Sequence, residues 1–340
     1  MSLTINHQTN DISATGAGSV TIDGATPGGG GADLYAAETT GSTDPTATGT
    51  LSLAIGSNAQ ADGNDSIAIG LDAVAGLDGI SIGKSAGNGT LSGGDYNLAV
   101  GRSAATYLTT GDNNVAVGRS ALQGSNLDKI TGSGNTAVGY GAGSKVSSGS
   151  NNFMAGTDAG NAITSGSSNT FIGFNSDGVA SSSNQTALGY QAISGGASAT
   201  ALTNSYASGS ESFAAAIANN TSSYGATGLM SVAIGSQARA NNAGSVAIGE
   251  VATSSGTLST ALGVGANATA IYSLATGRNS NATATRAFSI GYGSTANQSD
   301  AYAFGYNAYA GVANQIALGG PTNTVKISTL HETVGTITTG

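Results

Sequence analysis

The chain lacks most of the residues with which soluble domains build a compact core. Its 340 residues include no cysteine, no tryptophan and only 3 prolines, and charged side chains make up only 8% of the total. Without cysteine there are no disulfide bonds and no thiol chemistry, and the redox compartment stays undetermined. Glycine, in contrast, is abundant, with 55 residues. This composition is typical of a repeat protein.

Positive charge is also scarce, because 9 Lys and Arg face 18 Asp and Glu, for a net charge of -9. We therefore expect no basic stripe and no nucleic-acid partner, and the acidity favours solubility of a long β assembly. No apolar run reaches the length of a membrane-spanning helix. The two histidines, His7 and His331, lie near opposite ends. We expect no cofactor and no metal site within one chain, while a histidine site shared by three chains stays open.

Glycines recur at intervals of 14 residues in the last third of the chain, each after a segment such as SVAIG, STALG or AYAFG. This spacing predicts a solenoid, and the extended, β-branched segments predict strands rather than helices. Seven of these glycines are predicted to be structural turn residues: Gly235, Gly249, Gly263, Gly277, Gly291, Gly305 and Gly319.

Each 14-residue unit contains two short alternating segments. Val232 and Ile234 flank Ala233, and because residues two apart share one face of a strand, we expect the large pair to point into the coil. The alanine face is then expected to receive partner chains. The segment after the glycine, with Ala238 and Ala240, is expected to supply small inward residues. The core of such a coil is thin, so we expect an oligomer; a monomeric solenoid is the alternative.

The repeat loosens toward the N-terminus. Between Gly83 and Gly189 the spacing is 16 to 21 residues, and stretches such as GDNN and SSGSNN are expected to be loops that absorb the extra residues. Two weak units are expected at Leu202 and Thr203 and at Ile217 and Ala218. With nine units up to Gly189 and seven in the strict block, this gives 9 + 2 + 7 = 18 coils.

Five segments follow from these patterns. We expect an N-terminal attachment arm with a strand at 19–23 and a glycine-rich tether (1–50), and then a β-roll with longer, loop-bearing coils (51–189). Degenerate coils (190–230), a strict 14-residue β-roll (231–320) and a C-terminal cap (321–340) complete the chain. A cap would cover the open last edge. A disordered N-terminus and a receptor-binding C-terminal tip are the alternatives.

The units SVAIGSQARANNAG and SVAIGEVATSSG resemble the head repeats of trimeric autotransporter adhesins of the YadA type. The looser NTAVGYGAGSKVSSGSNN and NTFIGFNSDG are similar to repeats of bacteriophage tail-fibre proteins. The resemblance covers about 51–319. It implies an all-β, left-handed parallel β-roll (β-solenoid), a homotrimer, and a non-enzymatic role in adhesion.

The sequence shows no secretion signal, no heptad stalk and no C-terminal membrane anchor of the adhesin type. We therefore expect a fibre of a bacteriophage virion, a tail fibre or similar, assembled in the host cytoplasm and released by lysis. Its expected partners are a virion attachment protein bound through the N-terminal arm and a glycan or protein of the host surface. A capsid-decorating or purely structural virion fibre and a bacterial surface adhesin head are the alternatives.

Aromatic residues directly after motif glycines suggest a contact surface. Tyr292 and Tyr306 are one coil apart, so we expect an outward ladder with Tyr309 nearby, able to stack on sugars or proteins. Simple coverage of the roll's edge is the alternative. The same end is expected to hold three inward aromatics, and the same position after a glycine holds three more outward ones. These are, in that order, Phe288, Tyr302 and Phe304, and Tyr140, Phe174 and Tyr190.

Other motifs are expected to be structural. DGISIGKS at 78–85 imitates a phosphate-binding loop, but Asp78 replaces the first glycine and the segment is itself a repeat strand. The pairs Asp62 with Asp65 and Asp95 with Asp112 are expected in solvated loops, with calcium binding as the alternative. No nucleophile, base and carboxylate occur in register. We therefore expect no catalytic residues and no enzyme activity.

Overall fold

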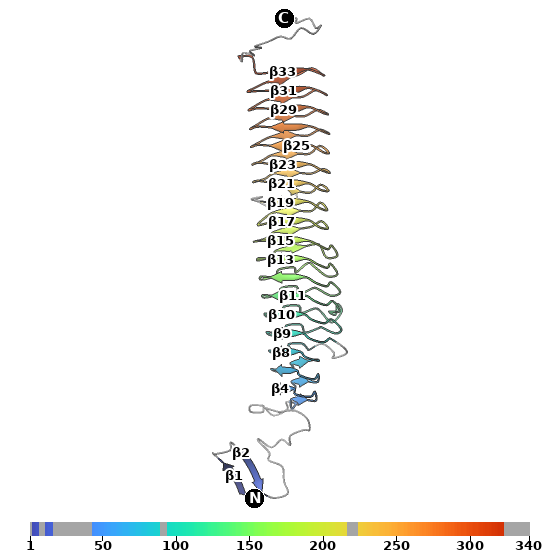
Figure 1. The fold of residues 1–340 in the computed structure, drawn as a ribbon, viewed down its shortest axis with the longest axis vertical. Helices are drawn as coiled ribbons and strands as arrows, with labels where there is room; N and C mark the ends of the chain where they lie inside the picture. Colours follow the sequence, from blue (N-terminus) through green and yellow to red (C-terminus); the bar gives the residue numbers. More distant parts are fainter. Residues whose placement is uncertain (1, 7–10, 16–42, 89–93, 216–223, 323–340) are drawn as a thin grey trace. The chain divides into compact units, whose positions relative to one another are not determined.

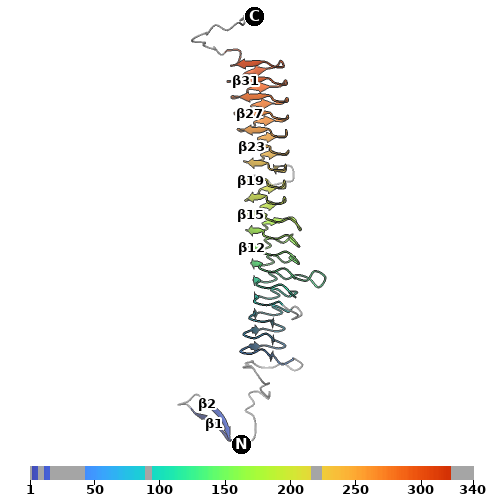
Figure 2. The same cartoon turned by 45° about the vertical axis from the view of Figure 1, so that its right-hand side comes forward.

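The computed structural model describes residues 2–6, 11–15, 43–88, 94–215 and 224–322. They fall into two compact units, residues 1–198 and 199–340, and the division lies within the predicted segment of degenerate coils. All regular elements of the described residues are β-strands. The prediction of an all-β parallel solenoid is confirmed in both units, whose stacked coils are visible in Figures 1 and 2.

A short hairpin precedes the solenoid in sequence. Strand β1 (Ser2–Asn6) pairs antiparallel with β2 (Asp11–Thr15), with Ile5 opposite Ile12. The sequence reading missed this hairpin. The strand predicted at 19–23, the glycine-rich tether, most of the C-terminal cap and both histidines lie outside the described residues.

The first unit stacks one three-residue strand per coil into a parallel ladder, with a second sheet of two-residue strands behind parts of it. The ladder runs through β4 (Leu53–Ile55), β6 (Ile67–Ile69), β8 (Ile80–Ile82), β9 (Leu98–Val100), β10 (Val115–Val117), β11 (Thr136–Val138), β12 (Phe153–Ala155), β13 (Thr170–Ile172) and β15 (Thr186–Leu188). The second sheet comprises β3 (Thr46–Ala47), β5 (Gln60–Ala61) and β7 (Val74–Ala75), and further along the chain β14 (Asp177–Gly178) and β16 (Ile193–Ser194). Because β3 pairs with β5, the solenoid includes residues before position 51, where the sequence predicted its start.

The second unit has the same organisation. Its long ladder contains β17 (Thr200–Leu202), β19 (Phe213–Ala215), β21 (Val232–Ile234), β23 (Val246–Ile248), β25 (Thr260–Leu262), β27 (Leu274–Thr276), β29 (Phe288–Ile290), β31 (Tyr302–Phe304) and β33 (Ile316–Leu318). The second sheet contains β18 (Tyr206–Ala207), β20 (Gly225–Ala226), β22 (Arg239–Ala240), β24 (Thr253–Ser254), β26 (Asn267–Ala268), β28 (Asn281–Ala282), β30 (Thr295–Ala296) and β32 (Tyr309–Ala310). The described residues hold nine ladder strands in each unit, and β3 is the second strand of a further coil before β4, so the solenoid has about 19 turns where 18 coils were predicted.

The direction predicted for the ladder side chains is wrong. Ala233 and its counterparts Ala247 and Ala261 are fully buried, whereas Val232 and Ile234 on either side are half-buried and Ile248 is 38% exposed. The aromatics Phe288, Tyr302 and Phe304, predicted to point inward, likewise occupy the outer face of their strands. The alanines therefore fill the chain's own core and are not available to a partner chain.

The coil is flat, and this explains the reversal. The second strand contributes Ala238 and Ala240, both fully buried as predicted, so small side chains face small side chains across the coil. Ser231, just before the ladder strand, is buried too, and its hydroxyl donates to the Gly228 carbonyl oxygen at 2.7 Å. Between two such short, closely packed strands there is no room for a valine or isoleucine, which must therefore point outward.

The longer coils of the first unit accommodate larger core residues. Each of four coils adds a large apolar side chain just before its Gly/Ser/Asn-rich segment, and these side chains are buried: Leu108, Ile130, Val146 and Ile163. Buried Met154 and Phe171 replace the ladder alanine in two coils, and small residues compensate. A Cβ on Gly143 would lie 2.7 Å from the Met154 sulfur, and one on Gly178 would lie 2.8 Å from Phe171 Cζ. The extra residues thus widen the core.

The Gly/Ser/Asn-rich segments themselves are ordered ladders and not insertions, which corrects the prediction that they absorb the extra residues. Buried Asn114 Oδ1 accepts from the backbone N of Asn135 at 2.9 Å, and Asn135 Oδ1 accepts from that of Asn152 at 3.0 Å. The amide nitrogens donate to carbonyl oxygens of the next coil, as Asn135 does to Gly149 at 2.9 Å. A parallel set of serine hydroxyls accepts backbone N–H groups, for example Ser133 N to Ser150 Oγ at 3.1 Å.

One weak unit was misplaced. Leu202 ends β17 as expected, but the next coil places Phe213, Ala214 and Ala215 against Val232, Ala233 and Ile234. The apolar position before the turn is therefore Ala215 and not Ile217, which lies outside the described residues. In this coil the large outward side chain is the first residue of the ladder strand, Phe213, and the third residue is the small Ala215.

Candidate functional site: the corner column and the apolar ribbon

Each coil turns a corner at its motif glycine. In the strict block these glycines have φ between 80° and 138°, a range that side chains disfavour. They also stack closely, because a Cβ on Gly263 would lie 2.7 Å from the carbonyl oxygen of Gly277. Two residues further on, Gln237 and Asn279 have φ of 57° and 55°. The residue between the two left-handed positions is thereby directed outward at the corner.

These corner residues form a column in each unit, which we call the corner column. In the second unit it contains Arg278, Tyr292 and Tyr306, and backbone hydrogen bonds between successive coils hold it in register. Gly293 N donates to Arg278 O at 2.9 Å, and Asn307 N donates to Tyr292 O at 2.8 Å.

The corner column brings two of the three predicted contact residues together. The Tyr292 and Tyr306 rings are stacked, with centroids 5.5 Å apart and 12° between their planes, and the side chains are 46% and 58% exposed. Arg278 Cζ lies 6.0 Å from the Tyr292 centroid. We call these three residues the Tyr292 ladder.

Tyr309 is exposed but belongs to the second strand of its coil, β32. Its hydroxyl accepts from Asn297 Nδ2 at 3.1 Å, and its ring lies over Gly311. It therefore leans along the second sheet and is not part of the corner column.

The corner column of the first unit holds more aromatic residues and a basic stretch that the sequence reading missed. Phe174 and Tyr190 stack with centroids 5.6 Å apart, and Tyr140 is 49% exposed. Before them in the column stand Lys84, Arg102 and Arg119, all exposed. Their position directly after a motif glycine was the signal that could have found them.

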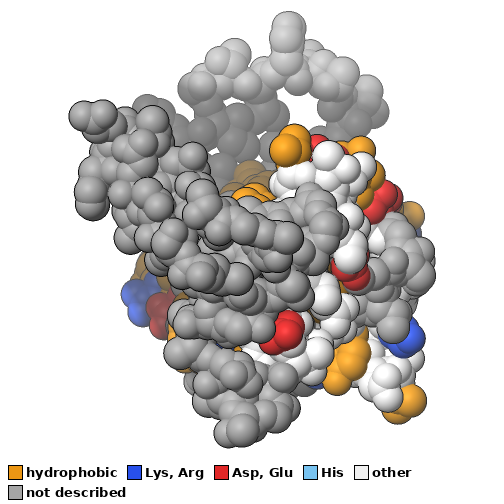
Figure 3. All heavy atoms as spheres, turned by 90° about the horizontal axis from the view of Figure 1, so that it is seen from below, with side chains coloured by type: hydrophobic (Ala, Val, Ile, Leu, Met, Phe, Trp, Pro, Cys, Tyr) orange, Lys and Arg blue, Asp and Glu red, His pale blue; other side chains and the backbone are white. Residues whose placement is uncertain are grey.

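A second surface feature comes from the ladder strands themselves. The outward first and third residues of β21 to β33 form two adjacent apolar columns, which we call the apolar ribbon. Its members are Val232, Ile234, Val246, Ile248, Leu262, Leu274, Phe288, Ile290, Tyr302, Phe304, Ile316 and Leu318. At its end Ile316 is 64% exposed. Hydrophobic side chains also reach the surface in the view of Figure 3.

The acidic pairs and the phosphate-loop imitation have structural roles. Residues 80–82 of the imitation form β8. Thr48 Oγ1 donates to Asp62 Oδ1 at 2.9 Å, and the backbone N of Asp95 donates to Asp112 Oδ1 at 2.9 Å. Within the described residues there is no group of three His, Cys, Asp or Glu side chains placed to hold a metal ion.

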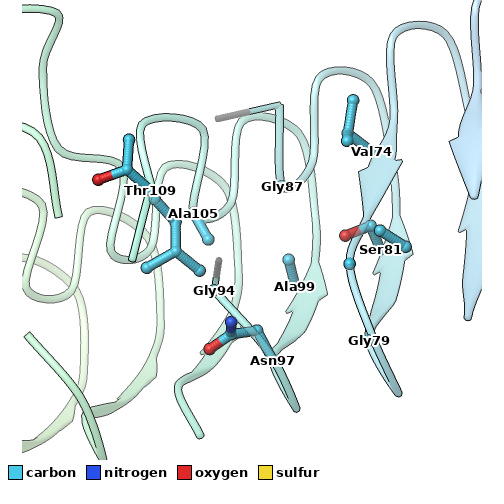
Figure 4. Close-up of a pocket in the computed structure, with 12 residues that line it drawn as sticks. Val74, Gly79, Ser81, Gly87, Gly94, Asn97, Ala99, Ala105 and Thr109 are labelled. Carbon is cyan, nitrogen blue, oxygen red and sulfur yellow. The ribbon is translucent and has the colours of Figure 1, made fainter. Parts of the chain in front are cut away.

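A small cavity lies between coils of the first unit (Figure 4). Ser81, Asn97, Ala99 and Thr109 are among the residues that line it, and its volume is about 30 Å³. This is the space of roughly one water molecule. The cavity is too small for an organic substrate.

Taken together, the fold is a parallel β-solenoid of short, two-strand coils with glycine corners. Four segments match the YadA head domain repeat (two copies), at residues 47–73, 226–249, 254–280 and 282–308. The chain thus carries YadA head domain repeats in both units, which confirms the resemblance to adhesin heads. No curated protein matches the chain significantly. No helix among the described residues is long and apolar enough to cross a membrane.

Proposed function

We propose that this protein is a non-enzymatic, homotrimeric fibre that attaches to a cell surface. The apolar ribbon supports the trimer, because a long, partly exposed apolar surface of this kind, interrupted only by Thr260 and Thr276, marks a protein interface. YadA head domains typically form homotrimers. The corrected side-chain directions place the large apolar residues on the outside of the single chain, where three copies can bury them together.

The Tyr292 ladder supports the attachment. Stacked, exposed tyrosines with a flanking arginine offer flat apolar faces together with hydrogen-bonding groups, the combination found at sugar and protein contact sites. Tyr309 extends the aromatic surface onto the neighbouring sheet.

Alanine replacement of Tyr292, Tyr306 and Tyr309 is expected to reduce adsorption to target cells on the order of ten-fold, because aromatic side chains dominate such contacts. Adsorption of fluorescently labelled protein measures the effect. Tyr272→Asn is the matched control, since Tyr272 is an exposed tyrosine at a left-handed position outside the column. The proposal fails if the triple variant adsorbs like the parent while both remain trimeric.

The setting we propose is a bacteriophage virion, on the basis of the looser repeats; a bacterial surface adhesin head is equally consistent with the YadA repeats. Immunogold labelling with antibodies against residues 231–319 tests this on phage particles and on bacterial cells. Label on the tail or capsid supports the virion fibre, whereas label only on intact cells supports the adhesin.

A further inference from the structure

Three of the nine Lys and Arg residues stand in one column on three successive coils of the first unit. Lys84, Arg102 and Arg119 each follow the glycine after β8, β9 and β10. The coils are locked in register at this corner, because Ser103 N donates to Lys84 O and Ser120 N donates to Arg102 O, both at 2.9 Å. Neighbouring coils of a parallel sheet are about 4.8 Å apart, so the three charges form a short, regular row.

Nothing in the described part of the chain neutralises this row. The one ion pair there joins Arg286 to Asp300, and Lys84, Arg102 and Arg119 have no acidic partner within ion-pair distance. The acidic residue Asp72 lies at the same corner, one coil before Lys84. Its carboxylate accepts a hydrogen bond from Asn58 Nδ2 at 2.8 Å and forms no ion pair with the row. Stacked like charges repel one another, so the row gives the fold no stability of its own.

An aromatic residue continues the row. Gly141 N donates to Arg119 O at 3.0 Å, which makes Tyr140 the next member of the column. Arg119 Cζ lies 5.4 Å from the centroid of the Tyr140 ring. The guanidinium group of Arg119 therefore lies over the face of the half-exposed Tyr140 ring in a cation–π contact. On the next coil Asp158 N donates to Tyr140 O at 2.8 Å, so an acidic residue lies beside the column just after Tyr140.

We infer that Lys84, Arg102, Arg119 and Tyr140 form a binding strip for an acidic polysaccharide. Guanidinium and ammonium groups at regular intervals match carboxylate or sulfate groups repeated along a sugar chain, and Tyr140 offers a face for a sugar ring. Duplex DNA fits less well, because it carries a charge about every 1.7 Å, much closer together than the charges of a row spaced at about 4.8 Å per coil. The inference rests on the proposed attachment function but uses a different surface from the Tyr292 ladder.

The test uses the full chain with a sulfated heparin oligosaccharide, polygalacturonate and, as the neutral control, dextran. We expect binding of one or both acidic sugars, weakened by added salt, and none of dextran. The variant K84Q/R102Q/R119Q should lose binding by on the order of ten-fold or more, the effect of removing charge-assisted contacts. Tyr140→Leu should weaken binding without changing its salt dependence.

The matched control K129Q/K145Q/R239Q removes three positive charges outside the column and gives the same formal net charge, -9 - 3 = -12. It should bind the acidic sugars as the parent does. Equal loss in both triple variants, no loss in the first, or tighter binding of a single-stranded oligonucleotide would overturn the inference. A chain that adsorbs to cells but binds neither acidic sugar would refute the strip and leave the proposed function standing. Binding of an acidic sugar without adsorption to cells would support the strip and refute the proposed attachment function.

Discussion

At the scale of single residues, the fold depends on what fits inside a very thin coil. Ala233 and Ala240 come from the two strands of one coil of the strict block, and both are fully buried. In the wider coils Met154 occupies the ladder position opposite Gly143 and Gly160, where an added Cβ would lie 2.7 Å and 2.6 Å from atoms of its side chain. The core is therefore specified by complementary sizes at individual positions.

Asp177 is the residue for which we expect a clear pH effect. Burial raises the pKa of its carboxyl above 3.8, although the backbone N–H groups of Gly178 and Ala162 partly oppose this. A raised carboxyl pKa means that the folded state holds the proton more tightly, so this group's contribution to stability is greatest below pH 3.8 and is lost as pH rises through the folded-state pKa. Relative to Asp177→Asn, the parent should therefore lose stability over that interval, as measured by thermal unfolding from pH 3 to 7.

Asp300→Asn serves as the opposing control. Arg286 donates to the Asp300 carboxylate at 2.6 and 2.7 Å and lowers its pKa. The stability that this pair contributes is present above pH 3.8 and is lost as pH falls through the lowered pKa. The two variants should therefore diverge from the parent in opposite directions with pH, and parallel curves would refute the assignment for Asp177.

At the scale of elements, the two kinds of coil close in different ways. In four coils of the strict block a serine before the ladder strand bonds within its own turn, as Ser231 does to Gly228. In the longer coils an asparagine takes its place and bonds to the next coil. The asparagine ladder therefore ties neighbouring coils together, whereas the serines only fix the turn of a single coil.

Asn135→Ala is expected to lower the free energy of unfolding by about 1–3 kcal/mol, the cost of leaving buried polar groups without partners. The substitution would strand the backbone N of Asn152 and the carbonyl oxygen of Gly149, which Asn135 contacts at 3.0 and 2.9 Å. Ser231→Ala removes one hydroxyl that bonds within its own turn and should cost about 1 kcal/mol. Urea denaturation followed by circular dichroism compares them, and equal losses would count against the ladder.

At the scale of the whole molecule, the large apolar residues of the second unit point outward, and we expect them to mediate the proposed assembly of three chains. We expect the protein in solution to have the mass of three chains, 3 × 32.5 = 97.5 kDa. Aspartate at Ile234, Ile248 and Leu262 should shift the mass toward 32.5 kDa, because three adjacent positions of the apolar ribbon would then carry charge. Multi-angle light scattering measures this.

The matched control places aspartate on the opposite sheet, at Arg239, Thr253 and Asn267, which lie in β22, β24 and β26. This variant should keep the mass of the parent. If it dissociates while the ribbon variant does not, the chains associate through the second sheet instead.

The sequence by itself determined the period, the corner glycines, the parallel strands and all but the first of the coils, because each follows from spacing and from side chains that repeat at fixed positions. It also placed Tyr292 and Tyr306 one coil apart. It left the side-chain direction ambiguous. Val232 and Ile234 lie on one face of the strand and Ala233 on the other, whichever of the two faces is buried. One signal in the chain did point the right way: the middle position is alanine or serine in every coil of the strict block, while its neighbours vary from threonine to tyrosine.

Only the tertiary structure decided which face is inside, because that depends on how closely the two strands of a coil approach. It also revealed the hydrogen bonds from Asn114 through Asn152, which join residues 17 or 21 positions apart and have no local signature. The row of Lys84, Arg102 and Arg119 could have been found from the sequence, because each residue directly follows a motif glycine, but the structure shows that backbone hydrogen bonds hold the three coils in register there. A net charge of -9 concealed it, since a sum over the chain carries no information about position.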